Sequence, residues 1–414
     1  MALVEASPLD VAAVRREFPV FEAHADRPFV YLDSASSSLK PQAVLDAMDD
    51  YYATTHANVH RGVYAMAEEA TARYEGSREI VGRFIGATSS REILYSKNVT
   101  ESLNLVANSW GRANLRPGDA VLLTEMEHHA MLVPWLMLKD QLGIELRYLG
   151  LTDDGRLDLS DLDAKLDGAR FLGVTAMSNV LGTLNPVRLL ADAAHAAGAV
   201  VCVDAAQLVP HVVTDVQALG ADFVAFTGHK MLGPTGIGVL WGREDALDAM
   251  PPFLGGGDMI RDVRLDGFTP NELPWKFEAG TPPIAEAIGL GAAVGVLERY
   301  GMEAVRAHEI EVTEYALRTL SSRFGDDLVV HGPADACARG GVLSFAYRDL
   351  HPHDISQMLD QSGVCVRAGH HCAKPLMRRL GVGATARASF YVYNDESDVD
   401  ALADALDACA ELFF

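Results

Sequence analysis

The sequence predicts an α/β protein, with a large domain built on a mostly parallel sheet and a smaller α+β domain at the C-terminus. Between about residues 31 and 283, short apolar runs alternate with helical stretches, and the runs are continuously apolar, as in strands buried on both faces. A stretch rich in Gly and Pro, residues 254–280, then reads as a loop. The remaining segment has shorter strands between helices, and 414 residues are enough for two or three domains.

The elements of the large domain follow in chain order. A first helix is predicted from Pro8 to Phe21, because Val11, Val14 and Phe18 recur at helical spacing. The predicted strands lie in the segments REILYS, DAVLLTEM, FLGVTAMSN, AVVCVD, DFVAFTG and GVLWG. In such a sheet, ligands bind beyond the carboxyl ends of the strands, so candidate site residues are sought there.

The C-terminal part begins with a long helix, predicted from Ile284 to Tyr300. Shorter strands follow in GVLSFAY, GVCVRAG and TARASFYVY, and an acidic helix from Glu396 closes the chain. We expect three units: residues 1–30 as an N-terminal segment that packs on the small domain, residues 31–283 as the large domain, and residues 284–414 as the small domain.

Composition narrows the partners and the compartment. With 34 Lys and Arg against 57 Asp and Glu, the net charge of −23 would repel nucleic acid and anionic membranes. No apolar run approaches the ~20 residues of a membrane span, and the start MALVEASPLD lacks the features of a secretory signal. The five cysteines are widely spaced and include no CxxC pair, which is typical of a reducing cytosol. We therefore expect a cytoplasmic protein.

A lysine in a glycine-rich turn is the first candidate site residue. Lys230 follows the strand that ends at Phe226, and lysine forms Schiff bases with aldehydes, although a lone lysine is more often a solvated surface residue. Asp204 closes AVVCVD, where a carboxylate is costly unless paired. A protonated pyridine nitrogen would be such a partner, and a helix N-cap is the alternative. Gln207 could reach the phenolic oxygen of the same ring.

An anion site is predicted where the strand in REILYS leads through Asn98 into a helix. Backbone N–H groups at a helix start, together with the Thr100 hydroxyl, bind phosphate well, although an ordinary Thr cap is the alternative. Thr227 and His229 could add donors from the lysine turn. His128, after VLLTEM, could stack on a flat cofactor and move protons; a histidine without a catalytic role is the alternative.

A cysteine and two arginines complete the candidates. Cys372 lies in VCVRAGHHCAKPLM, where Gly, His and Pro predict a loop, and neighbouring protonated histidines would favour its thiolate. An inert cysteine is the alternative, and it suits Cys202 and Cys365 better because they sit in apolar strands. Arg387, on a late strand, could hold an amino-acid carboxylate through two parallel hydrogen bonds, and Arg367 is the weaker candidate.

A metal site is a competing interpretation of the cysteine loop. Its donors would be His351, His353, His370, His371 and Cys372. Three consecutive residues are poorly placed to bind one ion, and the sequence has no HExxH or CxxC motif. We therefore expect no metal bound within the chain.

Taken together, these motifs resemble those of the class V, fold-type I pyridoxal-phosphate (PLP) enzymes, and within them the SUF-type (group II, SufS-like) cysteine desulfurases. The matching strings run in order along nearly the whole chain: YLDSASSSLKP, NVHRGVY, NLVANSWGR, EHHAMLVPW, SNVLGT, VDAAQ, TGHKMLGPTGIG, FEAGTP and RAGHHCAKPLM. The resemblance implies a PLP-dependent enzyme that converts L-cysteine to L-alanine, carries the sulfur as a persulfide, and supplies it for iron–sulfur cluster assembly.

The resemblance also implies a role for each candidate residue. Lys230 would carry PLP and act as the base, Asp204 would hold the ring nitrogen, and His128 would stack on the ring. Gln207 and Asn179 would lie near the phenolic oxygen, and the phosphate would be held by Thr100, Thr227 and His229. Arg387 would bind the substrate carboxylate with Asn179 near the substrate, and Cys372 would accept the sulfur. A homodimer is implied as well, in which Thr281 of the partner subunit completes the phosphate site.

A few positions depart from the family pattern. Met131 replaces an amide in EHHAM, Thr227 stands for a serine in TGHK, Pro283 follows FEAGTP where Asn is usual, and Asn98-Val99 replaces Gly-Thr. None of these changes removes a group that would bond to the substrate, so the predicted reaction is unaffected.

The family passes its sulfur to small carrier proteins, one kind of which bears zinc. The string LHPHD resembles desulfurases that work with the zinc-bearing, SufU-like kind, so His353 would exchange onto the carrier's zinc. The alternative is that His351 and His353 merely start the helix DISQMLDQSG, with Pro352 at its first position. Three other functions compete: selenocysteine lyase or cysteine-sulfinate desulfinase activity, a non-catalytic PLP-binding subunit, and a metal-binding module.

Overall fold

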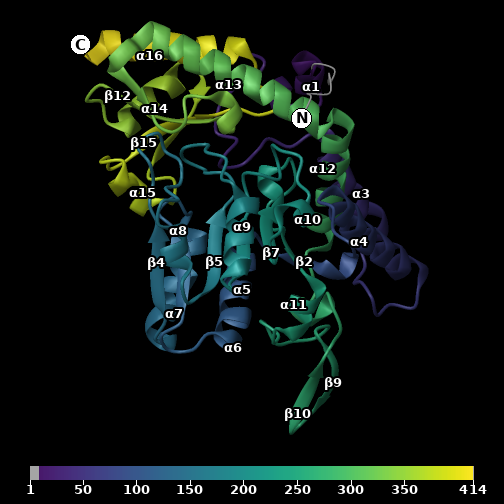
Figure 1. The fold of residues 1–414 in the computed structure, drawn as a ribbon. Coiled ribbons are helices and arrows are strands. Elements are labelled where there is room, and N and C mark those ends of the chain that lie inside the picture. The colour runs from purple at the N-terminus through teal and green to yellow at the C-terminus, as the bar shows by residue number, and fades with distance from the viewer. Residues whose placement is uncertain (1–8, 414) are drawn as a thin grey trace.

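A seven-stranded sheet forms the centre of the protein, as the computed structural model of residues 9–413 shows (Figure 1). Its strands are β2 (Ile93–Ser96), β3 (Ala120–Thr124), β4 (Glu145–Leu149), β5 (Ala169–Thr175), β6 (Val200–Asp204), β7 (Phe223–Thr227) and β8 (Gly238–Gly242). They lie in the order β2-β8-β7-β6-β5-β3-β4, and β8 runs antiparallel to its neighbours β2 and β7, while β3 to β7 are parallel. The predicted α/β class with a mostly parallel sheet is confirmed.

Helices cover both faces of this sheet, because alternate residues of a buried strand point to opposite sides. In β3, Ala120 and Leu122 belong to the core on one face, while Val121 and Leu123 belong to the core on the other. The first core includes residues of α4 (Ala65–Phe84), α9 (Val187–Ala196) and α12 (Ile284–Tyr300), and the second includes residues of α5 (Val99–Val106) and α7 (His129–Leu142). Shorter helices join these layers: α3 (Gln42–Asp50), α6 (Arg112–Asn114), α8 (Leu162–Leu166), α10 (Val216–Leu219) and α11 (Glu244–Ala249).

The C-terminal part has its own four-stranded antiparallel sheet and its own core. Its elements are β11 (Leu328–Val330), β12 (Val342–Tyr347), β14 (Arg367–Gly369), β15 (Thr385–Ser389), α13 (Met302–Phe324), α14 (Pro352–Gln361), α15 (Lys374–Arg379) and α16 (Glu396–Phe413). The strand order is β11-β12-β15-β14, and α13 and α16 lie side by side on the outer side of this sheet (Figure 1).

The N-terminal segment forms two short helices rather than the single helix that the sequence predicted. They are α1 (Val11–Arg16) and α2 (Pro19–Ala23), and Pro8 lies outside the described residues. Phe18 is extended (φ −109°, ψ 104°) because a following proline disfavours the helical conformation. The one-helix prediction was therefore wrong at this point.

Contacts of this segment are with the C-terminal part of the chain. The ring of Phe18 meets that of Tyr393 edge-on at 5.0 Å, and Arg15 donates to the carboxylate of Asp398 at 2.6 Å. Strand β1 (Val30–Tyr31) pairs in parallel with β13 (Val364–Cys365). These contacts agree with the expected packing of residues 1–30, and the three-unit division itself stays a prediction.

Helix α12 connects the two parts of the molecule. It packs on α3 and α4, so its contacts place it with the part of the chain that contains the large sheet. Gly301, with a φ of +81°, ends it, and α13 then starts in the other part and packs along α16. This packing favours Gly301 over residue 284 as the start of the small domain.

The stretch 254–280 contains a hairpin that the sequence analysis did not anticipate. Strands β9 (Ile260–Arg264) and β10 (Gly267–Pro270) pair antiparallel and project away from the body of the protein (Figure 1). Leu265 and Phe268 are exposed on it. Describing this whole stretch as a loop was wrong, because its polar and Gly-rich composition concealed two short strands.

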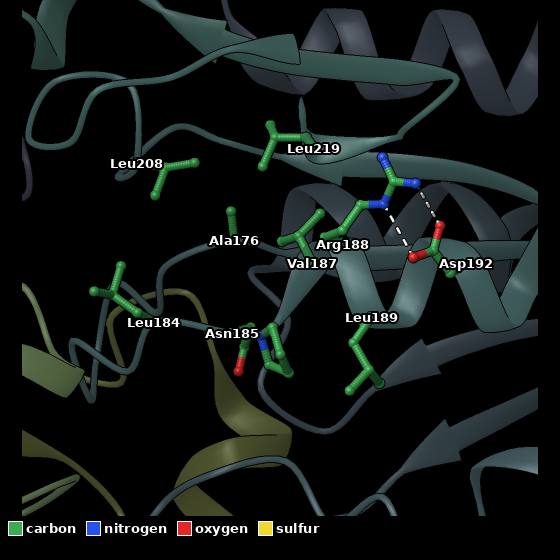
Figure 2. Close-up of a pocket in the computed structure, with 10 residues that line it drawn as sticks. Ala176, Leu184, Asn185, Val187, Arg188, Leu189, Asp192, Leu208 and Leu219 are labelled. Carbon is green, nitrogen blue, oxygen red and sulfur yellow. Dashed lines mark hydrogen bonds and ion pairs between the residues drawn. The ribbon is translucent and has the colours of Figure 1, made fainter. Parts of the chain in front are cut away.

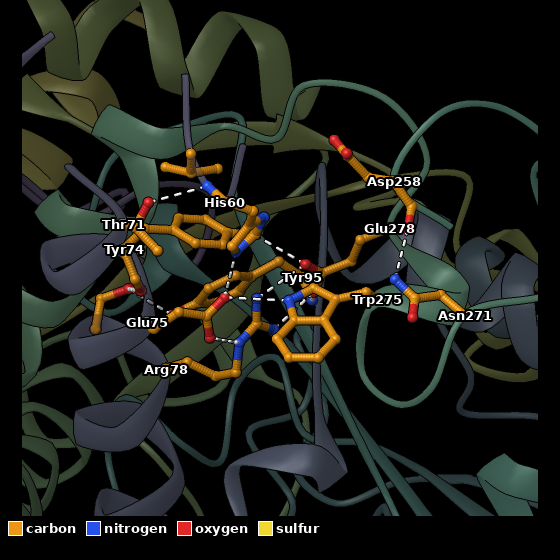
Figure 3. A network of polar contacts seen from close by, with 12 residues as sticks. His60, Thr71, Tyr74, Glu75, Arg78, Tyr95, Asp258, Asn271, Trp275 and Glu278 are labelled. Atoms are coloured by element: carbon orange, nitrogen blue, oxygen red, sulfur yellow. Dashed lines mark hydrogen bonds and ion pairs between the residues drawn. The ribbon is translucent and has the colours of Figure 1, made fainter. Parts of the chain in front are cut away.

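A buried ion pair anchors the segment that follows this hairpin (Figure 3). Arg78 of α4, only 1% exposed, donates to both carboxylate oxygens of Glu278 at 2.7 and 2.9 Å. The hydroxyl of Tyr74 and the backbone N–H of Tyr95 also donate to Glu278. Because a buried charge is costly unless it is fully paired, this network holds α4, β2 and the Glu278 segment together.

Candidate active site

The carboxyl ends of the strands of the large sheet meet at one edge, where a cavity of about 510 Å³ opens. Asp204 ends β6, Thr227 ends β7, His128 follows β3 and Asn179 follows β5. The small domain closes the other side of the cavity through β14, β15 and the loop between them. The predicted residues that line it are Thr100, His128, Asn179, His229, Lys230, His353, Arg367, Cys372 and Arg387.

Lys230 lies in the tight turn after β7. Gly228 allows this turn, since a Cβ at that position would lie 2.6 Å from a methyl group of Ile237. Burial lowers the pKa of Lys230 to about 8, while the nearby charge of Asp204 opposes the shift and that of Arg387 adds to it. A larger fraction of neutral amine makes Lys230 a better nucleophile near neutral pH than an exposed lysine.

Asp204 is buried beside this lysine. Burial raises the pKa of its carboxyl group, and the backbone N–H of Ala206, which donates to Oδ1 at 3.0 Å, and the charge of Lys230 oppose the shift. Gln207 is buried as well, and its Nε2 donates to the carbonyl of Ala35 at 2.8 Å. The Oε1 of Gln207 is buried and has no partner among the described residues. A cationic ring N–H is the kind of partner that a buried carboxylate needs.

The predicted phosphate-binding residues are only partly brought together. Thr100, at the start of α5, and His229, in the turn after β7, both line the cavity. The hydroxyl of Thr227, in contrast, is buried and donates to the carbonyl of Ile237 at 3.4 Å. Thr281 lines a different cavity, of about 410 Å³. A role for Thr281 in the site of a partner subunit therefore stays a prediction.

His128 is positioned as the N-cap of α7. Its Nδ1 accepts the backbone N–H of Ala130 at 3.0 Å, which places the proton of the neutral ring on Nε2. Burial, followed by the charge of Lys230, lowers the pKa of His128 to about 3. The ring is therefore neutral near pH 7, which suits stacking better than the proton transfer that the sequence also suggested.

Arg387 extends from β15 into the cavity and is buried. Its Nη1 donates to the carbonyl of Asn179 at 2.9 Å, and its Nη2 donates to Ser36 at 2.7 Å and to Asp33 at 3.3 Å. Burial lowers its pKa to about 10, with Asp33 opposing, so it remains charged at neutral pH. Arg367, which is exposed, donates to the same Ser36 hydroxyl at 2.6 Å.

Ser36 and Asp33 were not assigned by the sequence analysis. Both lie in YLDSASSSLKP, a string that was noted for its resemblance alone. This string could not be connected with a role for Ser36 and Asp33, because their partner Arg387 follows some 350 residues later in the sequence. They hold the two arginines at the cavity.

Cys372 lies on a strained loop that faces the cavity. His371 and Cys372 have φ values of +48° and +55°, a left-handed conformation that is uncommon for residues other than glycine. The N–H of His129 donates to the carbonyl of Cys372 at 2.7 Å, and the amide of Asn179 donates to that of His371 at 2.7 Å. The Cys372 side chain is exposed.

The other cysteines lie elsewhere. Cys202 and Cys409 are buried and Cys365 is half-buried, while Cys337 is exposed but lies outside the cavity. Cys372 is the cysteine among the cavity's lining residues, in agreement with the prediction that set it apart from the strand cysteines.

The five metal donors considered from the sequence do not form one cluster, although ligand atoms of His370 and Cys372 lie within 4.8 Å of each other. His371 is buried, its Nε2 lies 2.9 Å from the hydroxyl of Thr385, and burial lowers its pKa to about 3. His351 caps α14, where its Nδ1 accepts the backbone N–H of His353. His353, in contrast, lines the active-site cavity.

A second hollow, of about 680 Å³, lies beside α9 (Figure 2). Apolar side chains such as Leu184, Leu189 and Leu208 line most of it, and Arg188 pairs with Asp192 at its margin. None of the predicted site residues faces this hollow. We therefore assign the active site to the cavity at the strand ends.

A reactive lysine after one strand, a buried carboxylate at the end of its neighbour and an anion site at a helix start define a PLP enzyme, and these residues fit that cofactor. The sequence pattern of the family Aminotransferase class-V matches residues 30–402. The chain belongs to this family, which confirms the predicted class V family and its PLP cofactor.

Relatives along the full chain are similar to it. The chain is 50% identical over 412 residues to a "Probable cysteine desulfurase" of Streptomyces coelicolor, with 98% of each chain covered, and 48% identical over 428 residues to a "Cysteine desulfurase" of Haloferax volcanii, with both chains fully covered. Among solved structures, the apo cysteine desulfurase of Thermococcus onnurineus superposes with a TM-score of 0.93 at 40% identity, covering 99% of this chain and 100% of that one.

Proposed function

We propose that this chain is a PLP-dependent cysteine desulfurase that converts L-cysteine to L-alanine and takes the sulfur onto Cys372 as a persulfide. The observation that carries the proposal is the placement of an exposed thiol, Cys372, in one cavity with Lys230 and Arg387. The named activity of relatives that are 48–50% identical along the whole chain supports it.

Each residue of the cavity has a part in this reaction. The guanidinium of Arg387 binds the carboxylate of L-cysteine, which orients the substrate. Lys230 removes the Cα proton, since its lowered pKa provides a neutral amine near pH 8. PLP, when bound, supplies the electron sink that stabilises the charge left on the substrate.

The sulfur step involves only the thiol and the substrate. The thiolate of Cys372 attacks the sulfur of bound cysteine, so that an S–S bond forms as the C–S bond breaks. The electron pair of the broken bond stays with the carbon skeleton, which is protonated and leaves as L-alanine. Cys372 keeps the sulfur as a persulfide, and its exposed position lets an acceptor reach it.

One experiment tests the proposal directly. The protein is incubated with L-cysteine, alanine is measured, and persulfides are mapped by mass spectrometry of its peptides. We expect one persulfide, on Cys372, and none on the exposed Cys337, which serves as an internal control. A Cys372→Ser variant should retain PLP but form no persulfide.

A persulfide on another cysteine, or none while alanine is still released, would contradict the sulfur-acceptor role of Cys372. Selenocysteine is the useful second substrate, because a lyase acting on it depends less on this thiol. If Cys372→Ser released alanine from selenocysteine at the full rate and the wild type did not use cysteine, the enzyme would be a selenocysteine lyase.

We further propose that the sulfur is passed to a small carrier protein for iron–sulfur cluster assembly in a SUF-type system in the cytoplasm, and that the enzyme works as a homodimer. The position of His353 at the edge of the Cys372 cavity supports the zinc-bearing kind of carrier, because its imidazole can be approached from solvent. Within residues 9–413, the helices include none with the length and apolar character of a membrane span.

A further inference from the structure

A thiol and two imidazoles converge at the opening of the active-site cavity. His129 is the first residue of α7, whereas His370 and Cys372 lie on the loop after β14, and one ligand atom from each lies within 4.8 Å of the other two. Tetrahedral zinc holds nitrogen and sulfur donors ~3.4–3.6 Å apart, as follows from bond lengths of about 2.0–2.3 Å. Small side-chain rotations would therefore bring the three atoms onto one ion.

The lone pairs of both imidazoles already face this loop. The Nε2 of His129 accepts the backbone N–H of Lys374 at 3.1 Å, and the Nδ1 of His370 accepts that of Cys372 at 3.1 Å. A cation would replace these two N–H groups at nitrogens that are already acceptors, so neither ring has to change its tautomer. The hydrogen bond from the N–H of His129 to the carbonyl of Cys372, at 2.7 Å, holds the two segments together.

The left-handed backbone separates the neighbouring histidines of this loop. With φ values of +48° at His371 and +55° at Cys372, the chain sends His371 inwards to Thr385, whereas His370 is directed towards His129, at 5.6 Å between ring centroids. Three consecutive residues therefore do not have to bind one ion, which was the objection to a metal raised by the sequence. The third donor comes from α7 instead.

We propose that His129, His370 and Cys372 form a chelating site for a thiophilic divalent cation such as Zn²⁺, and that the bound ion stops desulfuration. Thiolate and imidazole are the donors that this ion prefers, and a water molecule completes the tetrahedron. The bound ion engages a lone pair of the thiolate sulfur, which makes Cys372 a weaker nucleophile toward the substrate sulfur. The inhibitory part of the inference rests on the proposed role of Cys372, whereas the site itself does not.

Alkylation of individual cysteines tests the site without relying on activity. The PLP-loaded enzyme is treated with iodoacetamide in solutions of buffered free Zn²⁺, and the alkylation rates of Cys372 and Cys337 are followed by peptide mass spectrometry. Zn²⁺ should slow alkylation of Cys372 at least tenfold and leave the exposed Cys337 unchanged. Mg²⁺, which prefers oxygen ligands, should protect neither.

Variants of the two histidines identify the ligands. His129→Ala and His370→Ala should each raise the Zn²⁺ concentration for half-protection at least tenfold, whereas His351→Ala, which removes another exposed histidine, should not change it. Visible absorbance of PLP and far-UV circular dichroism verify the fold of each variant. Absence of protection in the wild type, or equal protection in the wild type and both ligand variants, would overturn the site.

Alanine release in the same Zn²⁺ buffers separates the two parts of the inference. Inhibition that follows the same Zn²⁺ dependence as protection, and that shifts with it in His129→Ala, supports both parts. Protection of Cys372 with undiminished alanine release would overturn the inhibitory role and also the proposed role of Cys372 as sulfur acceptor, while the chelating site would stand.

Discussion

The two sides of the active-site cavity differ in rigidity and in access to solvent. On one side, Asp204 is buried at the end of β6, and Lys230 lies half-buried in the tight turn after β7. On the other side, Cys372 and His353 are exposed on a loop and at a helix start. The difference separates two requirements: removing a Cα proton benefits from a dry, preorganised environment, whereas passing on sulfur requires a group that a partner can reach.

The largest effect is expected on the buried side. Lys230→Ala removes the proposed base and the attachment point of PLP, so alanine release should fall by roughly 10²–10⁴-fold. In the wild type, borohydride should attach PLP to the peptide that contains Lys230, as peptide mapping would show. Attachment at any other lysine would contradict the assignment of Lys230.

A substitution of Arg387 tests how strongly the cavity binds the carboxylate of L-cysteine. Charge-assisted hydrogen bonds contribute ~1.5–3 kcal/mol, so Arg387→Ala should raise the KM for L-cysteine by about tenfold or more. PLP content, measured by absorbance, should remain intact. Arg367→Ala is the matched control, because Arg367 is exposed and donates to the same Ser36; an equal effect of both variants would argue against Arg387 as the main carboxylate ligand.

The lowered pKa of Lys230 predicts a particular pH dependence of cofactor uptake. Only the neutral amine attacks an aldehyde, so the rate at which cofactor-free protein takes up PLP should rise with pH up to about 8 and then level off. N-acetyl-lysine methylamide, an exposed amine with a pKa of ~10.4, serves as the reference and should keep rising. A protein rate that rises like the reference beyond pH 9 would show that burial does not tune Lys230.

The smallest effect on the reaction itself is expected from the exposed histidine. His353→Ala should leave alanine release with a chemical reductant unchanged, while stimulation by a zinc-bearing sulfur carrier should disappear. His351→Ala, two residues earlier, is the matched control and should respond normally. Full stimulation of the His353 variant would leave His353 as an ordinary residue of the helix start.

The sequence predicted the buried side of the cavity better than the exposed side. Asp204, Lys230 and His128 could be located because parallel strands end at one edge of a sheet, so that a strand pattern by itself brings these positions together, whereas Asn179 was named from the family resemblance alone. His129 could not be given a role, because its partners His370 and Cys372 lie about 240 residues later and only the folded loop shows which way each side chain points.

Local chemistry explains the other differences. The prediction of one N-terminal helix did not take Pro19 into account. A proline disfavours the helical conformation of the residue before it, so the first helix ends before Phe18. The hairpin β9–β10 was missed because its strands, IRDVR and GFTP, have no buried face and therefore lack the continuous apolar runs by which the other strands were found.

Of the hydrogen bonds near the cavity that join the chain before Gly301 to the chain after it, three are accepted by the backbone carbonyls of Asn179, His371 and Cys372. Arg387 donates to the carbonyl of Asn179, the amide of Asn179 donates to the carbonyl of His371, and the N–H of His129 donates to the carbonyl of Cys372. Any hinge motion that separates the two parts has to break all three bonds. Loss of the Asn179 side-chain amide would therefore free the carbonyl of His371 and loosen the loop that carries Cys372, whereas Arg387 would keep its hydrogen bond, because its acceptor is the backbone carbonyl of Asn179.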